Sequence, residues 1–137
     1  MLIRQLALEC GYSGASIRER IYSTQADCSM SMCGILLYTA TPDSDGSLGG
    51  LVRMGRPENL GSLISAALQE ALWCSADPLC MESTGQGLEA LNYAACHACA
   101  LLPETSCEAR NCLLDRCAVV GKLEDRGFGY FGDKLSL

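Results

Sequence analysis

The stretch that decides the fold is Cys96-His97-Ala98-Cys99, because it places two thiols within one turn of chain. Cys74 and Cys80 precede this stretch, and Cys107 follows it. A tetrahedral zinc site needs four ligands, and a Cys-x-x-Cys knuckle supplies two of them from a single turn. The spacing therefore predicts that Cys96 and Cys99 form one half of a structural zinc site.

The second half of the predicted site must come from Cys74, Cys80 and Cys107. Thr105 and Glu108 form a capping box, which predicts that Cys107 lies in the first turn of a helix. Free amides and the helix dipole favour a thiolate at that position. Cys80 follows a turn-like segment with a proline, where the backbone can hold a ligand. Five cysteines thus compete for four positions, and their spacing leaves the choice open.

The other cysteines are expected to be small apolar side chains, as free thiols often are: Cys10, Cys28, Cys33, Cys112 and Cys117. A thioredoxin-like redox pair would open a helix at the end of a strand, whereas Cys96 follows a helix-like segment. Covalent haem attachment needs a histidine directly after the second cysteine, and residue 100 is alanine. His97 is expected to face solvent, because enough sulfur ligands are available.

The chain is predicted to be a non-catalytic domain. It has one histidine and no Gly-x-Ser-x-Gly motif, so no hydrolytic triad can be assembled. Two alternatives belong to other classes: a metal-dependent enzyme in which Asp43, Asp45 or His97 joins the metal, and a thiol redox switch. Asp43 and Asp45 resemble the start of a calcium loop, but Leu48 stands where that loop requires glycine.

Length and charge exclude several classes of protein. The chain has 137 residues, of which 49% are hydrophobic, and a net charge of −6. These values predict one folded domain over 1–137 and disfavour autonomous binding to nucleic acid, whose affinity comes largely from basic side chains. The sequence contains neither an apolar run long enough to span a membrane nor a signal peptide, so a cytoplasmic location with reduced thiols is expected.

Apolar periodicity and caps predict an α+β fold that is mostly helical, with a short buried strand or small sheet and a cysteine-rich zinc site. A helix that starts at Met1 and carries Ile3, Leu6, Ala7 and Cys10 on one face is expected to stop at Gly11. No N-cap residue precedes this helix, which suggests a C-terminal fragment of a larger protein. A capping box predicts a helix over 17–22, and a β-branched, aromatic run predicts a buried strand over 34–42.

The second half of the chain is expected to hold the longest helix, from Pro57 to about Trp73. A loop over 43–50 precedes it. A short helix over 88–95 and another from Thr105 to a stop at Gly121 complete the prediction. Residues 122–137 read as a glycine-rich tail that is loosely ordered or docks on a partner.

Three motifs in order carry a family resemblance: residues 34–50 (GILLYTATPDSDGSLGG), residues 74–80 (CSADPLC), and residues 95–111 (ACHACALLPETSCEARN) followed by Leu114-Asp-Arg116. This pattern resembles the zinc-binding C-terminal domain of the DrmB family, helicase-associated components of the DISARM anti-phage system. It is more distantly similar to the C-terminal zinc-binding domain of Mrf-type DNA-repair helicases. The resemblance covers residues 2–120.

The resemblance implies that Cys96, Cys99 and Cys107 bind Zn²⁺ together with Cys80 or Cys74. It further implies a zinc-stabilised accessory domain of a bacterial anti-phage or DNA-processing protein, which contributes to DNA engagement or partner docking within a larger complex. The motor motifs of helicases, including a phosphate loop, do not occur in the sequence, so this chain is not expected to hydrolyse ATP. Arg53 and Arg56 are the favoured DNA contacts, because they flank the glycine-rich loop and the start of the longest helix.

Overall fold

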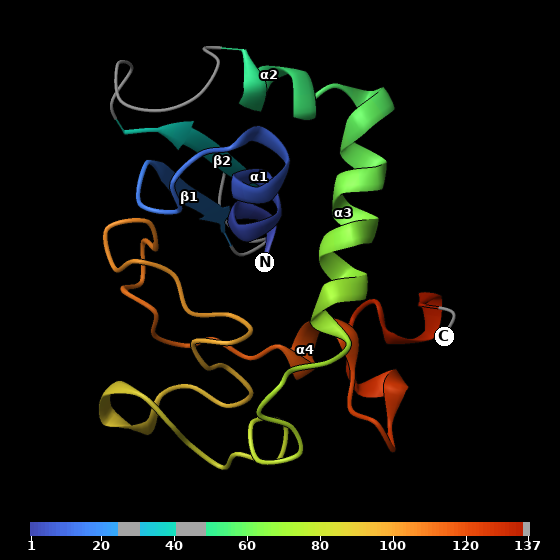
Figure 1. The fold of residues 1–137 in the computed structure, drawn as a ribbon. Helices are drawn as coiled ribbons and strands as arrows, with labels where there is room; N and C mark the ends of the chain where they lie inside the picture. Colours follow the sequence, from blue (N-terminus) through green and yellow to red (C-terminus); the bar gives the residue numbers. More distant parts are fainter. Residues whose placement is uncertain (25–30, 41–48, 136–137) are drawn as a thin grey trace.

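The structure, a computed structural model, describes residues 1–24, 31–40 and 49–135. Helix α1 (Leu2–Cys10) and a two-stranded sheet of β1 (Ile17–Ser23) and β2 (Cys33–Thr39) lie on one side of the long helix α3 (Pro57–Ala71). A short helix, α2 (Gly50–Met54), precedes α3 at its N-terminal end (Figure 1). The chain after α3 is mostly irregular and ends beside the short helix α4 (Cys117–Val120). The α+β fold class is confirmed.

Helix α1 forms where its apolar periodicity predicts. Ile3 and Leu6 are buried on one face, one turn apart, and pack with Tyr12, Ile17 and Leu63 into the upper core of the molecule. The helix ends at Gly11, whose φ of 71° is a left-handed conformation that glycine adopts without a steric penalty. The predicted helix and its stop are therefore confirmed.

The helix predicted over residues 17–22 is wrong, because these residues form strand β1. Seven antiparallel residue pairs join β1 to β2, from Ile17 opposite Thr39 to Ser23 opposite Cys33. The supposed capping residue Ser16 donates its hydroxyl to the Ser13 carbonyl (2.7 Å) instead of accepting a bond from the next turn. Long-range strand pairing thus overrides the local helix signal.

Strand β2 is confirmed as a strand, but the prediction that it is buried is wrong. Ile35 and Leu36 are exposed, and only Leu37 and Thr39 are half-buried on the side that meets the core. The sheet has two strands among the described residues, so its outer face packs against no further layer there. The predicted loop over 43–50, with Asp43 and Asp45, lies largely outside the described residues.

Helix α3 confirms the prediction that the longest helix begins at Pro57, and it ends at Ala71, close to the expected end at Trp73. Pro57 occupies its first turn, where a missing backbone N–H costs nothing. Its buried stripe joins two cores, because Leu63 packs with α1 whereas Ala71 packs with Leu72 and Val120 of α4. The end of α3 therefore delivers the chain directly to the cysteine-rich region.

The helix predicted over 88–95 is wrong beyond one 3₁₀ turn, and the helix predicted from Thr105 is wrong except for its last turn, α4. Asparagine side chains organise this region as turns instead. Only a 3₁₀ turn at Leu88–Ala90 is helical between residues 72 and 116. Asn92 is buried, donates to the Asn111 carbonyl (2.7 Å) and accepts from the Leu114 N–H (2.8 Å). Asn111 donates to the Leu102 carbonyl and accepts from the N–H of the same residue. These bonds satisfy backbone groups that a helix would otherwise pair.

The tail after α4 folds back onto that helix. Gly121 ends α4 as predicted, with a φ of 81°. The N–H groups of Tyr130 and Phe131 donate to the carbonyls of Ala118 and Val119, at 3.0 and 2.9 Å. The close approach requires glycine at position 129, where a Cβ would lie 1.9 Å from the Gly121 nitrogen.

We predict that Asn92→Ala lowers the free energy of unfolding by about 1–3 kcal/mol, because two half-buried backbone groups lose their partners. Urea unfolding of the metal-loaded protein measures the change. Asn59→Ala is the control, since it removes one exposed bond to the Arg53 carbonyl and should cost less than half as much. Equal losses in the two variants would contradict this role of Asn92.

Candidate metal centre

Four cysteine sulfurs converge between the end of α3 and the Cys96–Cys99 turn. The Sγ atoms of Cys74, Cys80, Cys96 and Cys99 all lie within 4.8 Å of one another. Three separations are 3.5 Å between Cys74 and Cys96, 3.7 Å between Cys80 and Cys99, and 3.8 Å between Cys96 and Cys99. A tetrahedron with zinc–sulfur bonds of about 2.3 Å has edges of about 3.8 Å. The four thiols therefore fit a zinc ion, and they are too far apart to be disulfides.

Cys74 and Cys80 belong to one tight turn after α3. The Cys74 N–H donates to Asp77 Oδ2 and the Asp77 N–H donates to the Cys74 carbonyl, both at 2.9 Å. The Ala76 N–H points to Cys74 Sγ (3.4 Å), and the Ala76 carbonyl accepts from the Cys80 N–H (2.9 Å). Both cysteines are buried. The turn thus presents two sulfurs on a backbone that its own hydrogen bonds hold.

Cys96 and Cys99 form the second turn. The Cys96 carbonyl accepts from the N–H groups of Cys99, Ala100 and Leu101, at 3.0–3.1 Å. The Cys96 N–H donates to Cys99 Sγ (3.3 Å), so the backbone of this turn also contacts its second sulfur. The Cys-x-x-Cys spacing therefore does bring two thiols to one point, as a metal knuckle requires.

The protein environment shifts the pKa values of the thiols in different directions. Burial raises the pKa of Cys74 and Cys80 above that of a free thiol, and neighbouring sulfurs add to the shift at Cys80. At Cys96 burial acts in the same direction, but the Ala98 N–H and the surrounding thiols together lower its pKa. Zinc binds thiolates, so a zinc ion that enters this group must displace the protons of the thiols and coordinate the sulfurs in their place.

Cys107 does not join the four sulfurs. It is buried close to Glu19 of β1, and burial first and Glu19 in addition raise its pKa. Ser106 Oγ donates to the Gly14 carbonyl (2.7 Å), and the Glu108 carboxylate accepts from the Ile21 N–H (2.8 Å), so this turn is held against the sheet. The expected set of Cys96, Cys99, Cys107 and one upstream cysteine thus differs from the observed group, which contains both Cys74 and Cys80.

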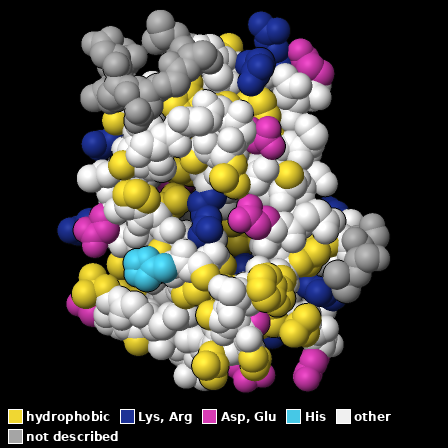
Figure 2. Space-filling view, viewed as in Figure 1, with side chains coloured by type: hydrophobic (Ala, Val, Ile, Leu, Met, Phe, Trp, Pro, Cys, Tyr) yellow, Lys and Arg dark blue, Asp and Glu magenta, His cyan; other side chains and the backbone are white. Residues whose placement is uncertain are grey.

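His97 is exposed to solvent, as expected, and is not among the clustered ligands. Its imidazole is visible on the surface in Figure 2. Its carbonyl accepts a bond from the Arg4 guanidinium (3.2 Å), which ties the second turn to α1. Asp43 and Asp45, the other residues considered as metal ligands, lie outside the described residues.

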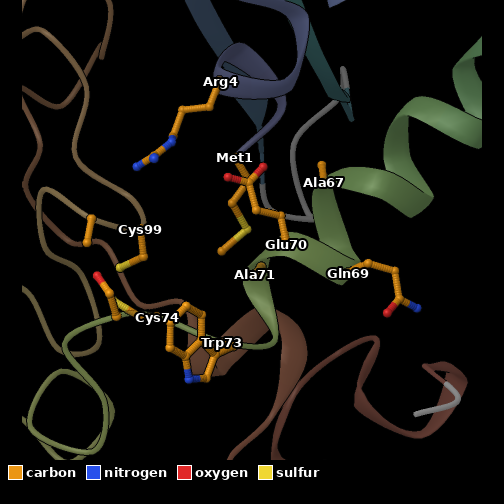
Figure 3. A pocket seen from close by; sticks show the side chains of 11 residues that line it. Met1, Arg4, Ala67, Gln69, Glu70, Ala71, Trp73, Cys74 and Cys99 are labelled. Carbon is orange, nitrogen blue, oxygen red and sulfur yellow. The ribbon is translucent and has the colours of Figure 1, made fainter. Parts of the chain in front are cut away.

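A pocket of about 310 Å³ opens beside the sulfurs. Figure 3 shows Cys74 and Cys99 on one side of it, with Trp73, Glu70 and Arg4 around the rim. The Trp73 side chain is 70% exposed, so it covers the pocket only in part. The pocket carries one acidic and one basic side chain on its rim, and two of the four cysteines line it.

Arg53 and Arg56 lie at the opposite end of α3 from the cysteines. Arg53 is in the last turn of α2 and Arg56 immediately precedes α3, and both are exposed. The 15 residues of α3 place them roughly 20 Å from the metal site. Burial raises the pKa of the Cys10 thiol, and the nearby Arg53 guanidinium partly offsets this effect.

The site includes two residues that the sequence does not identify as part of it, Asp77 and Arg116. Arg116 is fully buried and forms an ion pair with Asp77, which in turn holds Cys74. The available signal was an acidic residue inside the Cys74–Cys80 turn and an arginine in the Leu114-Asp-Arg116 motif. Neither pattern shows that the two side chains meet, since 38 residues separate them in sequence.

Comparison with known proteins agrees with this geometry. The MrfA Zn-binding domain family matches residues 1–100, a range that contains all four clustered cysteines and stops before Cys107. The DISARM protein DrmB of Bacillus paralicheniformis is 46% identical over 131 residues, which are 96% of this chain and 22% of that relative. The chain therefore spans about a fifth of the relative's length.

The family assignment agrees with the chemistry of the donor set, which consists of four sulfurs. Within the described residues, every helix is too short or too polar to cross a membrane. Since the family match covers most of the chain and includes the sulfur group, this chain belongs to the MrfA Zn-binding domain family and is a DrmB-like zinc-binding domain.

Proposed function

We propose that the chain is a zinc-stabilised accessory domain in which Cys74, Cys80, Cys96 and Cys99 are the ligands. The observation that carries this proposal is the group of four sulfurs at separations that suit tetrahedral zinc. Zinc supplies cross-linking here: bound to all four thiolates, it joins the end of α3 to the Cys96–Cys99 turn. The proposed role of the site is structural.

A structural role is favoured over catalysis by the number of sulfur ligands. A catalytic zinc keeps one position open for water, whereas four thiolates fill a tetrahedral ion. His97 is exposed and is not part of the group, so its imidazole does not replace one of the sulfurs as a ligand. We therefore propose that the domain serves a larger DISARM-type protein, inside the cell where thiols stay reduced, without chemistry of its own.

Engagement of DNA is proposed only within that larger protein. Arg53 and Arg56 are exposed next to the N-terminal end of α3, where free N–H groups favour anions. Glu58 in the same helical turn and the net charge of −6 oppose binding by the chain alone. Figure 2 shows basic and acidic side chains interspersed over one face rather than a basic stripe. The two arginines would thus assist a stronger DNA site elsewhere in the assembly, or the surface would dock a protein partner.

We predict one zinc ion per chain, lost on substitution of any one of the four clustered cysteines by serine. Elemental analysis of protein purified in reductant measures the stoichiometry. Zinc removal by a chelator should unfold at least residues 72–116, because the binding energy of a structural zinc is largely folding energy. Hydrogen exchange of zinc-loaded and stripped protein locates the loss.

Cys107→Ser is the matched control for the zinc site, since Cys107 is buried, as Cys74 and Cys80 are, but lies outside the group. This variant should retain one zinc per chain. Loss of zinc in Cys107→Ser with retention in Cys80→Ser would assign the site to the other set of cysteines. Metal-free wild-type protein that is folded, with reversible disulfides among the four, would support a redox switch instead.

We predict that Arg53→Ala with Arg56→Ala weakens DNA binding of the larger complex without changing the zinc content of the domain. If each arginine contacts one phosphate, the slope of log affinity against log salt should fall by about 1.8. Titrations at several salt concentrations measure the slope. Arg18→Ala with Arg110→Ala is the control pair, exposed and elsewhere on the domain. An unchanged affinity and slope would favour partner docking over DNA contact.

A further inference from the structure

Arg116 is the largest fully buried side chain in the part of the chain that the structure describes. Its NH2 group contacts Asp77 Oδ1 at 2.6 Å, and its NH1 group donates to the Ala71 carbonyl at 2.9 Å. Its Nε is buried without a partner. Burial opposes the positive charge, yet Asp77 and the nearby thiols together raise the pKa of the guanidinium. Arg116 is therefore a charged group held inside the protein next to the sulfur cluster.

The side chain of Arg116 holds the first half of the metal site. Asp77 uses one carboxylate oxygen for Arg116 and the other for the Cys74 N–H. Ala71, the second partner of the guanidinium, is the last residue of α3. The guanidinium thus fixes the Cys74–Cys80 turn against the helix that delivers it.

The backbone of Arg116 holds the second half of the site. The Arg116 N–H donates to the Ala94 carbonyl (2.9 Å), two residues before Cys96. In the same segment the Tyr93 N–H donates to the Leu114 carbonyl (3.0 Å). Arg116 therefore contacts both segments that carry the cysteine pairs. The first cysteines of these pairs, Cys74 and Cys96, are 22 positions apart in sequence.

Stability alone gives a weak reason for this arrangement. A buried ion pair often contributes less to stability than well-packed apolar side chains of similar volume. Arg116 leaves one donor unpaired, which adds to that cost. Its charge also cancels that of Asp77, so the pair adds no net charge beside the thiolates. What the pair provides is a fixed orientation of the two cysteine turns.

We propose that Arg116 is a positioning residue of the metal site: acting through Asp77, it sets the Cys74–Cys80 turn at the distance from Cys96 and Cys99 that tetrahedral zinc requires. This inference rests on the proposed function, in which those four thiolates bind the metal. Residues that orient metal ligands typically change metal affinity by about 10–100-fold when substituted. Arg116 itself touches neither the metal nor a sulfur in this role.

The test measures zinc affinity by competition with a chromophoric chelator on the full chain. The variants are Arg116→Met, Asp77→Asn and the two combined, with Arg116→Lys to keep the charge without the planar fork. Each single variant should bind zinc about 10–100-fold more weakly while keeping one ion per chain. The double variant should be no weaker than the weaker single one, because both substitutions break the same link.

Arg20→Met is the matched control, because Arg20 forms the exposed ion pair with Glu108 away from the sulfurs. Its zinc affinity should stay within about twofold of wild type, as expected for a surface pair. Cobalt substitution gives an independent readout: the intensity of the visible bands, which reports tetrahedral geometry, should change in the Arg116 and Asp77 variants but not in the control.

Each outcome decides between explanations. Unchanged affinity and cobalt spectra, or additive losses in the double variant, would overturn the positioning role while leaving the zinc site intact. Wild-type affinity in Arg116→Lys would overturn the geometric role in favour of charge alone. If Arg116→Met does not fold even with zinc, Asp77→Asn and Arg116→Lys decide. Wild-type protein that binds no zinc would refute the proposed function itself, which is a separate result.

Discussion

The convergence of four cysteine sulfurs is the constraint on which the lower half of the molecule depends. The only helical structure in residues 72–116 is one 3₁₀ turn, and the small core of this region consists of Met81 and Ala94 with Cys117 of α4. Such a segment buries too little apolar surface to offset the conformational entropy of ordering it. A metal that joins the Cys74–Cys80 turn to the Cys96–Cys99 turn would supply the missing cross-link, much as structural zinc does in other small folds.

Side-chain amides and one buried ion pair hold the chain around the four sulfurs in place. Asn92 and Asn111 satisfy backbone groups that regular secondary structure would otherwise pair, and Arg116 contacts both cysteine-bearing segments. Positive φ values at Arg110, Asn111 and Leu113 accompany these turns. Backbone of this kind is held in place when surrounding contacts determine it, and here the contacts come from polar side chains rather than from a large apolar core.

Features set by local chemistry could be predicted from the sequence, and features set by distant partners could not. Apolar periodicity and caps were sufficient for α1 and α3, and the Cys-x-x-Cys spacing was sufficient for one half of the site. The helix expected over 17–22 is a strand because β2 pairs with it. The paired residues are 10 to 22 positions apart in sequence, from Ser23 with Cys33 to Ile17 with Thr39. That error also concealed the position of Cys107, since its turn is held by bonds to β1.

Helix α3 connects the two parts of the domain that we assign to different tasks. Its C-terminal end meets Arg116 and the cysteine turns, whereas Arg53 and Arg56 lie at its N-terminal end, roughly 20 Å away. Leu63 belongs to the core around α1, and Ala71 belongs to the core around α4. Loss of metal would loosen the second core first, and the first core could persist through α1 and the sheet. The exposed arginines therefore belong to a part of the fold whose packing does not require zinc directly, so metal binding and surface contacts can be separated by substitution.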